Sequence, residues 1–143
     1  LEGEARDVGA EQGRMALEAK ARGERVAIMS GGELTVTVVG DGSGGPNQEY
    51  ALGLAIALGG AAGISALAGD TDGTDGGGGN ADDPAGAMVM PDTLSRAAAA
   101  NLNAAKFLAN NDSTRFFRTI GDLVECGPTQ TNVNDFRVIL VDP

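Results

Sequence analysis

The sequence contains no histidine and no tryptophan, a single cysteine, and only 3% aromatic residues. The lack of histidine excludes Ser-His-Asp and Cys-His catalysis and removes a common zinc ligand. The lone Cys126 excludes an internal disulfide and is typical of a reducing compartment, so we expect a cytoplasmic protein. Because Cys126 lies in an apolar run, we predict a buried structural thiol rather than a nucleophile.

Basic residues are also scarce: ten Lys and Arg face twenty Asp and Glu, for a formal charge of −10. This balance argues against nucleic acid or an anionic membrane as a partner, because both favour clustered Lys and Arg. A phosphate ligand would need backbone N–H groups, a metal ion or a partner's basic residues.

No apolar segment reaches the roughly 18 residues that would span a bilayer. The start at Leu1, without an initiator Met or a signal peptide, predicts a piece of a longer protein.

The length of 143 residues and the 42% hydrophobic content predict one domain with a real core. Since aromatics are few and Gly and Ala abundant, that core must depend on close approach of the backbone. Alternating patterns predict a single α/β domain, a mixed β-sheet with helices packed on it. We expect helices at 4–22, 47–58, 92–100, 103–109 and 112–120, and strands at 25–29, 33–39, 64–68, 123–126 and 136–141. The segment 85–90 fits a helix or a strand, and we favour the helix.

An acidic loop, GDTDGTDG at 69–76, follows the predicted strand 64–68. Its three carboxylates repel one another, and water, a cation or hydrogen-bond donors would relieve that repulsion. Two interpretations stay open: the ligand-facing edge of a phosphate-handling site, or a solvated surface loop. The register fails for an EF-hand, and the run 76–81 misses the calcium-binding nonapeptide. Mg²⁺ held by one or two carboxylates remains open.

Two further loops combine glycine with polar residues. GSGGPN at 42–47 precedes a predicted helix that Asn47 could cap, so its N–H groups could bind an anion; a plain turn is the alternative. No Lys follows the glycines, so the loop is not a P-loop. GPTQTNVND at 127–135 could present amides and hydroxyls to a ligand or brace its own turn. NDS at 111–113 indicates a helix cap rather than a glycosylation site.

Five motifs occur in order: SGGE at 30–33 with TVT at 35–37, GGPNQE at 44–49, DTDGTDG at 70–76, NDS at 111–113 and GPTQTNVND at 127–135. Their order and spacing resemble the C-terminal portion of the type-2 glycerate kinases, also named hydroxypyruvate reductases, which carry the MOFRL domain. The resemblance covers nearly the whole chain. It implies transfer of the γ-phosphoryl group of ATP to D-glycerate, giving 2-phosphoglycerate, with Mg²⁺. It also implies an active site in a cleft between this domain and a Rossmann-like N-terminal domain that is absent here.

The motifs select candidate site residues. Asp72 and Asp75 are the catalytic candidates, to orient the glycerate hydroxyl and accept its proton. Asp70 and Asp72 are the candidate Mg²⁺ ligands. Many relatives have Arg where this chain has Pro46, so positive charge must come from Arg137, Lys106 or the missing domain. The candidates for substrate and phosphate binding are Ser30, Gly31, Gly32, Glu33, Gly44, Gly45, Asn47, Gln48, Glu49, Thr129, Thr131, Asn132, Asn134 and Asp135.

Two other functions stay open at this point. One is an NAD(P)H-dependent hydroxypyruvate reductase, although the sequence has no dinucleotide fingerprint. The other is a stand-alone binding or interaction module without catalysis. We expect the chain alone to be inactive as a kinase, and the sequence leaves open whether it forms a homodimer.

Overall fold

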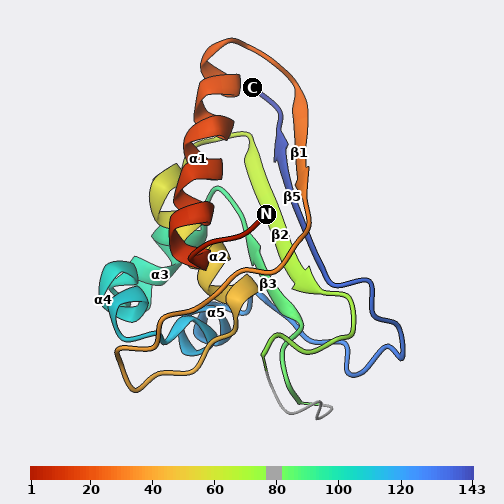
Figure 1. Cartoon of the computed structure of the whole chain (residues 1–143). Helices are drawn as coiled ribbons and strands as arrows, with labels where there is room; N and C mark the ends of the chain where they lie inside the picture. The colour runs from red at the N-terminus through yellow and green to blue at the C-terminus, as the bar shows by residue number, and fades with distance from the viewer. Residues whose placement is uncertain (77–81) are drawn as a thin grey trace.

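The computed structural model describes residues 1–76 and 82–143, and its helices gather on one side of a twisted sheet (Figure 1). In chain order the elements are α1 (Ala5–Ala21), β1 (Val26–Ser30), α2 (Pro46–Leu58), β2 (Ile64–Asp70), β3 (Gly86–Val89), α3 (Thr93–Ala99), α4 (Ala104–Ala109), α5 (Ser113–Ile120), β4 (Leu123–Val124) and β5 (Asp135–Val141).

The sheet has the strand order β1-β5-β2-β3-β4, and each of these neighbouring pairs is antiparallel. The predicted α/β class is confirmed, but the pairing is antiparallel rather than mixed. β1 and β2, which α2 connects, run in the same direction, as a βαβ pattern predicts. β5 lies between them and opposes both, so the two parallel strands never pair. The sequence pattern does not predict which strands are neighbours, so the expected mixed pairing is wrong.

The core lies between the helices and the covered face of the sheet, and small residues let its backbones come close. A Cβ atom at Gly9 of α1 would lie 2.2 Å from the carbonyl oxygen of Tyr50 in α2, and one at Gly13 would lie 2.9 Å from the Cβ of Ala57. The helix α2 is buried on nearly all sides, with Leu52 and Leu54 completely inaccessible. The prediction of a core built on close backbone approach is confirmed.

The opposite face of the sheet is open in Figure 1, and no described helix covers it. It carries four exposed apolar side chains: Met29 of β1, Met88 of β3, and Phe136 and Leu140 of β5. Met29 is 65% exposed and Leu140 50%. Separately, none of the described helices combines the length and apolar character needed to cross a bilayer.

The strand predicted at 33–39 is wrong, because its alternation has another cause. Leu34 is buried in the core, while the intervening threonines bind Glu4 next to α1. Thr35 forms an isolated bridge with Glu4, and the Glu4 carboxylate accepts hydrogen bonds from the N–H and the hydroxyl of Thr37 at 3.1 and 2.6 Å. The segment is therefore held beside the start of α1 by side chains rather than by a sheet ladder.

Three other local predictions also change. Residues 85–90 contain the strand β3 instead of a helix, since pairing with β2 overrides the helix propensity of Ala and Met. The helix α2 begins at Pro46, so Gly45 rather than Asn47 is its N-cap. Cys126 is exposed, because β4 ends at Val124 and leaves the thiol beyond the sheet.

Candidate active site

Four of the predicted loops meet at one end of the sheet, where β2 ends and β5 begins. Asp70 at the end of β2 is paired with Asp135 at the start of β5, which brings the acidic loop beside the loop 127–134. Ser30 at the end of β1 is paired with Arg137, which brings the turn 31–33 to the same place. The loop 42–45 joins them through the first turn of α2, which binds Asp75 of the acidic loop. The sheet register therefore assembles a rim from segments that are far apart in the sequence.

Asp75 links the acidic loop to the first turn of α2. Its Oδ1 accepts hydrogen bonds from the backbone N–H and the side-chain amide of Asn47 at 3.0 and 3.1 Å. Its Oδ2 accepts from the same two groups of Gln48 at 2.8 and 3.0 Å. Burial raises the pKa of the Asp75 carboxyl, and these four hydrogen bonds oppose the increase. The N-terminus of α2 thus already holds an anion, which is a side chain of the protein.

Arg137 of β5 ties three parts of the rim together although it is completely buried. Its Nη2 donates to the carbonyl oxygens of Gly31 and Gly32 at 2.8 and 2.7 Å. Its Nη1 donates to Oδ1 of Asn47 at 3.0 Å and pairs with Asp135 at 3.3 Å. The charge of Arg137, predicted to be available to a ligand, is instead engaged within the protein.

The Asn-Gln-Glu run at 47–49 is buried and joins elements of the fold. Gln48 accepts a hydrogen bond from the hydroxyl of Thr114 at 2.5 Å, which links α2 to α5. Glu49 pairs with Arg6 of α1 at 3.2 Å and accepts from the side-chain amide of Asn111 at 2.9 Å. These side chains were predicted to contact substrate. The structure places them mainly as supports beneath the rim.

The support residues Arg6, Asn111 and Thr114 were not predicted from the sequence as parts of the site. The run 111–113 was interpreted as a helix cap, yet the side chain of Asp112, the N-cap of α5, makes no capping bond. It accepts instead from the N–H of Ser43 at 3.2 Å, while Asn111 accepts from Val39 and Gly40. The only sign of these contacts in the sequence was the polar run 111–113 just before the amphipathic helix α5. Such a run does not show which distant residues it binds.

An acidic pocket of about 320 Å³ opens on the rim between the acidic loop and the loop 127–134. Asp70 accepts a hydrogen bond from the N–H of Asp72 at 3.0 Å, and Asp72 accepts from that of Thr74 at 2.9 Å. Partial burial, together with the nearby carboxylates of Asp72 and Asp135, raises the pKa of Asp70 to about 6. The pocket is lined by Glu33, Leu34, Pro46, Asp70, Asp72, Asp75, Gly76, Asn132, Asn134 and Asp135.

The predicted Mg²⁺ ligands fit a weakly held ion better than a dedicated metal cage. Asp70 and Asp72 each use one oxygen to accept a backbone N–H, which leaves the other oxygen for a cation. In residues 1–76 and 82–143, no three Asp, Glu or Cys side chains are grouped as a metal site. Mg²⁺ needs only one or two protein carboxylates when phosphate oxygens and water complete its shell. The calcium motif considered at 76–81 lies largely outside the described residues.

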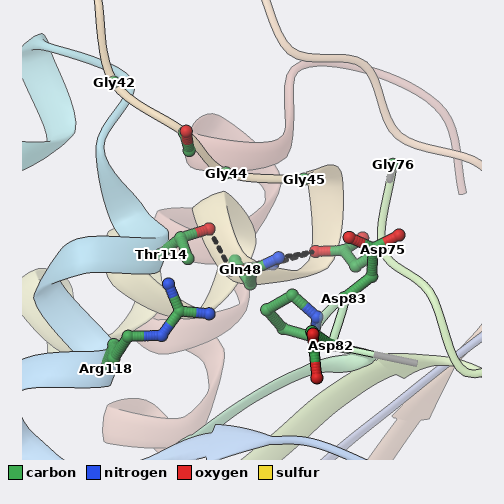
Figure 2. A pocket seen from close by; sticks show the side chains of 12 residues that line it. Gly42, Gly44, Gly45, Gln48, Asp75, Gly76, Asp82, Asp83, Thr114 and Arg118 are labelled. Carbon is green, nitrogen blue, oxygen red and sulfur yellow. Dashed lines mark hydrogen bonds between the residues drawn. The ribbon is translucent and has the colours of Figure 1, made fainter. Parts of the chain in front are cut away.

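A second cavity, the glycine-loop pocket, lies between the loop 42–45 and α5 and has a volume of about 450 Å³ (Figure 2). The N–H of Gly42 donates to the carbonyl of Asn110, and the N–H of Thr114 to that of Ser43, which seats the loop against α5. The pocket is lined by Gly42, Ser43, Gly44, Gly45, Gln48, Asp75, Gly76, Asp82, Asp83, Pro84, Thr114 and Arg118. Arg118 was not predicted to be part of the site.

The remaining predicted residues of the loop 127–135 divide between the pocket and the loop itself. Asn132, Asn134 and Asp135 line the acidic pocket. Thr129 uses its hydroxyl to donate to the carbonyl of Thr71 at 2.5 Å, and Thr131 lines a shallower hollow beside Asp72. The interpretation that the loop braces its own turn is confirmed by the bonds from the N–H groups of Thr131 and Asn134 to Thr129 and Asn132, and ligand binding stays a prediction.

The chain matches one protein family and several longer proteins. The model of the MOFRL family matches residues 26–135. A protein of Agrobacterium vitis with the provisional name hydroxypyruvate reductase is 50% identical over 147 aligned residues, which cover 99% of this chain and 33% of the relative. The D-glycerate 2-kinase of Thermotoga maritima is 43% identical over 115 residues, which cover 80% of this chain and 27% of that enzyme.

A solved structure agrees with these sequence relationships. The crystal structure of the glycerate kinase of Thermotoga maritima superimposes with a TM-score of 0.90 at 39% identity, and the match covers 99% of this chain and 34% of that one. This chain therefore spans about a third of the length of the relatives that it matches.

Proposed function

Because the chain belongs to the MOFRL family, whose model matches residues 26–135, we propose that it forms one wall of the active site of an ATP-dependent glycerate 2-kinase. The reaction would transfer the γ-phosphoryl group of ATP to the 2-hydroxyl of D-glycerate, giving 2-phosphoglycerate. The longer relatives support a further domain, which in this proposal closes the cleft over the rim. Cytoplasmic location belongs to the same proposal.

The observation that carries the proposal is the acidic pocket on the rim. Its volume suits a small hydroxy acid, and the amides of Asn132 and Asn134 can bind hydroxyl groups. Its carboxylates would repel the carboxylate of glycerate, so that group must face cations of the further domain. The hydroxyl of the substrate would then point toward Asp72.

In the proposed reaction, the 2-hydroxyl oxygen bonds to the γ-phosphorus while the bond from that phosphorus to the ADP oxygen breaks. Asp72 orients the hydroxyl and takes its proton. Asp75 has both carboxylate oxygens bound to N–H groups, so we now assign it a positioning role at α2. One oxygen of Asp72 accepts the N–H of Thr74, so its other oxygen is given to the substrate hydroxyl, and the free oxygen of Asp70 would hold Mg²⁺. When bound, Mg²⁺ would neutralise charge on the transferring phosphoryl group.

The experiment is the Asp72→Asn variant of the full-length enzyme. We expect turnover to fall tenfold or more, since a general base typically contributes about 10²–10⁴-fold and loses that role as an amide. ADP release with D-glycerate measures it. Asp142→Asn is the matched control, because Asp142 pairs with Arg25 at the opposite end of the sheet. Near-normal turnover of Asp72→Asn would remove this residue from the chemistry.

A second candidate function comes from the name of the Agrobacterium vitis relative. A hydroxypyruvate reductase would oxidise NAD(P)H when supplied with hydroxypyruvate, and absorbance at the nicotinamide band follows that directly. Hydride transfer by the full-length protein, with no ADP formed from ATP and D-glycerate, would replace the kinase proposal.

A further inference from the structure

The glycine-loop pocket has a wall of hydrogen-bond donors. In the part of the chain that the structure describes, the backbone N–H groups of Gly44 and Gly45 meet no acceptor. Both residues line the pocket, and Gly45 is buried. Buried residues nearly always have their N–H groups satisfied, so the donor of Gly45 calls for an acceptor from outside the chain, whereas Gly44 is exposed and its N–H is open to a ligand.

Arg118 of α5 adds a positive charge to the same cavity. Arg118 is the one cation among the described residues that line the pocket. In Figure 2 its guanidinium points toward Gln48 and Thr114. Its ion pair with Glu125 is long, at 3.5 Å, and both side chains are more than half exposed. Such a surface pair is weak, so Arg118 is available to an anion.

The opposite charge is present as well, because Asp82 and Asp83 line the same pocket. These carboxylates would repel a bare phosphate but attract a cation that the phosphate carries. A polyphosphate complexed with Mg²⁺ offers both: oxygens for Arg118 and the glycine N–H groups, and a cation for the acidic wall.

We propose that the glycine-loop pocket binds the magnesium-complexed polyphosphate of the phosphoryl donor, with Arg118 and the N–H groups of Gly44 and Gly45 as the anion-binding groups. The inference rests on the proposed kinase function for the identity of the donor. The two pockets share Asp75 and Gly76 as lining residues. A donor in the glycine-loop pocket therefore lies beside the acidic pocket, where the hydroxyl acceptor and Asp72 are placed.

The test is calorimetric titration of the 143-residue chain with magnesium tripolyphosphate and with MgATP. Arg118→Gln should weaken both by about tenfold or more, since a charge-assisted hydrogen bond is lost. Arg115→Gln is the matched control: Arg115 lies on the same helix, is also exposed, and lines a different hollow with Lys106. It should change the dissociation constant less than twofold.

Amide chemical shifts provide a second readout. On titration of the labelled chain, the N–H resonances of Gly44 and Gly45 should move, while that of Gly59, the C-cap at the far end of α2, should not. Equal weakening by the two arginine variants, or no binding at millimolar ligand, would overturn the site. Equally tight binding of tripolyphosphate in EDTA would overturn the role of the metal complex.

The outcome separates this inference from the proposed function. Arg118-dependent binding in a chain whose full-length enzyme forms no ADP with D-glycerate would keep the site and reject the kinase. A full-length kinase in which Arg118→Gln and Arg115→Gln have the same KM for ATP would keep the function and reject the site.

Discussion

A buried arginine determines how the rim is assembled. The guanidinium of Arg137 binds the turn after β1, the start of α2 and the start of β5 at the same time. It also lies over the ring of Tyr50, 5.5 Å from its centroid. A solvent-exposed ion pair would hold these carbonyls less firmly, because water would compete for the same hydrogen bonds.

Arg137→Met is expected to lower the free energy of unfolding by about 3–5 kcal/mol, since it leaves buried carbonyl and carboxylate oxygens without their donor. Denaturant unfolding of the 143-residue chain measures this. Arg25→Met is the control, because the Arg25–Asp142 pair is exposed and should contribute little. Equal stability of the two variants would contradict the role of Arg137.

Asp70 predicts a pH dependence of stability. Its pKa of about 6 in the folded chain lies above its ordinary value of 3.8, so the folded state binds the proton more tightly than the unfolded chain does. The contribution of Asp70 to the free energy of unfolding is therefore greatest below about pH 4 and is lost as pH rises toward 6. The Asp70→Asn variant cannot take up this proton, so its free energy of unfolding should not show this decrease between pH 4 and 6.

Denaturant unfolding between pH 4 and 7.5 in EDTA checks the prediction. The stability of Asp70→Asn relative to the parent chain should rise over this interval up to about pH 6 and then stay constant. Asp41→Asn, at an exposed residue, should run parallel to the parent. A constant difference for Asp70→Asn would show that its proton affinity is the same in both states.

At this scale the sequence predicted which residues gather but not what each one does. The three aspartates of the acidic loop look equivalent in the sequence. In the fold, Asp75 is buried with both carboxylate oxygens bonded to α2, while Asp70 and Asp72 are only partly buried in the wall of the acidic pocket. Burial of one carboxylate out of three depends on Asn47 and Gln48, which lie 28 and 27 residues earlier in the chain, and the local spacing of the aspartates does not indicate these partners.

Among the elements, α2 depends most on a partner outside itself. Its first turn receives the Asp75 carboxylate, and Pro46 occupies its first position, where a missing N–H costs nothing. The sequence left open whether an anion binds at this helix start or the glycine loop is a plain turn. The structure supplies that anion from the loop after β2.

Asp75→Asn should lower the free energy of unfolding by about 2–4 kcal/mol, because an amide NH₂ would face the N–H donors of Gln48 and leave them unsatisfied. Asp72→Asn, in the same loop but only partly buried, is the control and should change stability much less. Thermal and denaturant unfolding measure both. A small effect at Asp75 would mean that the acidic loop can give up its contact with α2 with little loss of stability.

The wrong element predictions share a physical origin. The alternation at 33–39 arises from threonine side chains that bind Glu4, and the Ala-rich segment 85–90 is recruited as a strand by β2. In both places tertiary partners override local preference. The helices α1 and α2 were predicted nearly to the residue, because α1 has a helical repeat of buried residues and α2 is a long apolar run.

In the whole molecule, one face of the sheet is packed and the other is apolar but open. Met29→Lys on the open face should leave the free energy of unfolding nearly unchanged, since this side chain is already 65% exposed. It should reduce binding of a hydrophobic dye and self-association of the 143-residue chain. Ile139→Lys, at a completely buried position of β5, is the contrasting variant and should prevent folding. Unchanged dye binding by Met29→Lys would mean that this face is not the accessible apolar surface.

The class of fold and the meeting of the loops were predictable from the sequence, because strand ends and glycine-rich turns mark a common edge. The position of β5 was not, since no local pattern states that the last strand pairs between two earlier ones. Without that insertion the rim would lack Arg137 and Asp135.

The central place of β5 also fixes when the protein can fold during its synthesis. As the chain leaves the ribosome, β1 and β2 emerge before β5. Until β5 is made, β1 has no strand of this sheet to pair with, and β2 lacks a neighbour along one edge. The edge of β2 that later pairs with β5 stays open while residues 71–134 are made, so we expect chaperones that shield exposed strands to bind the nascent chain at this stage.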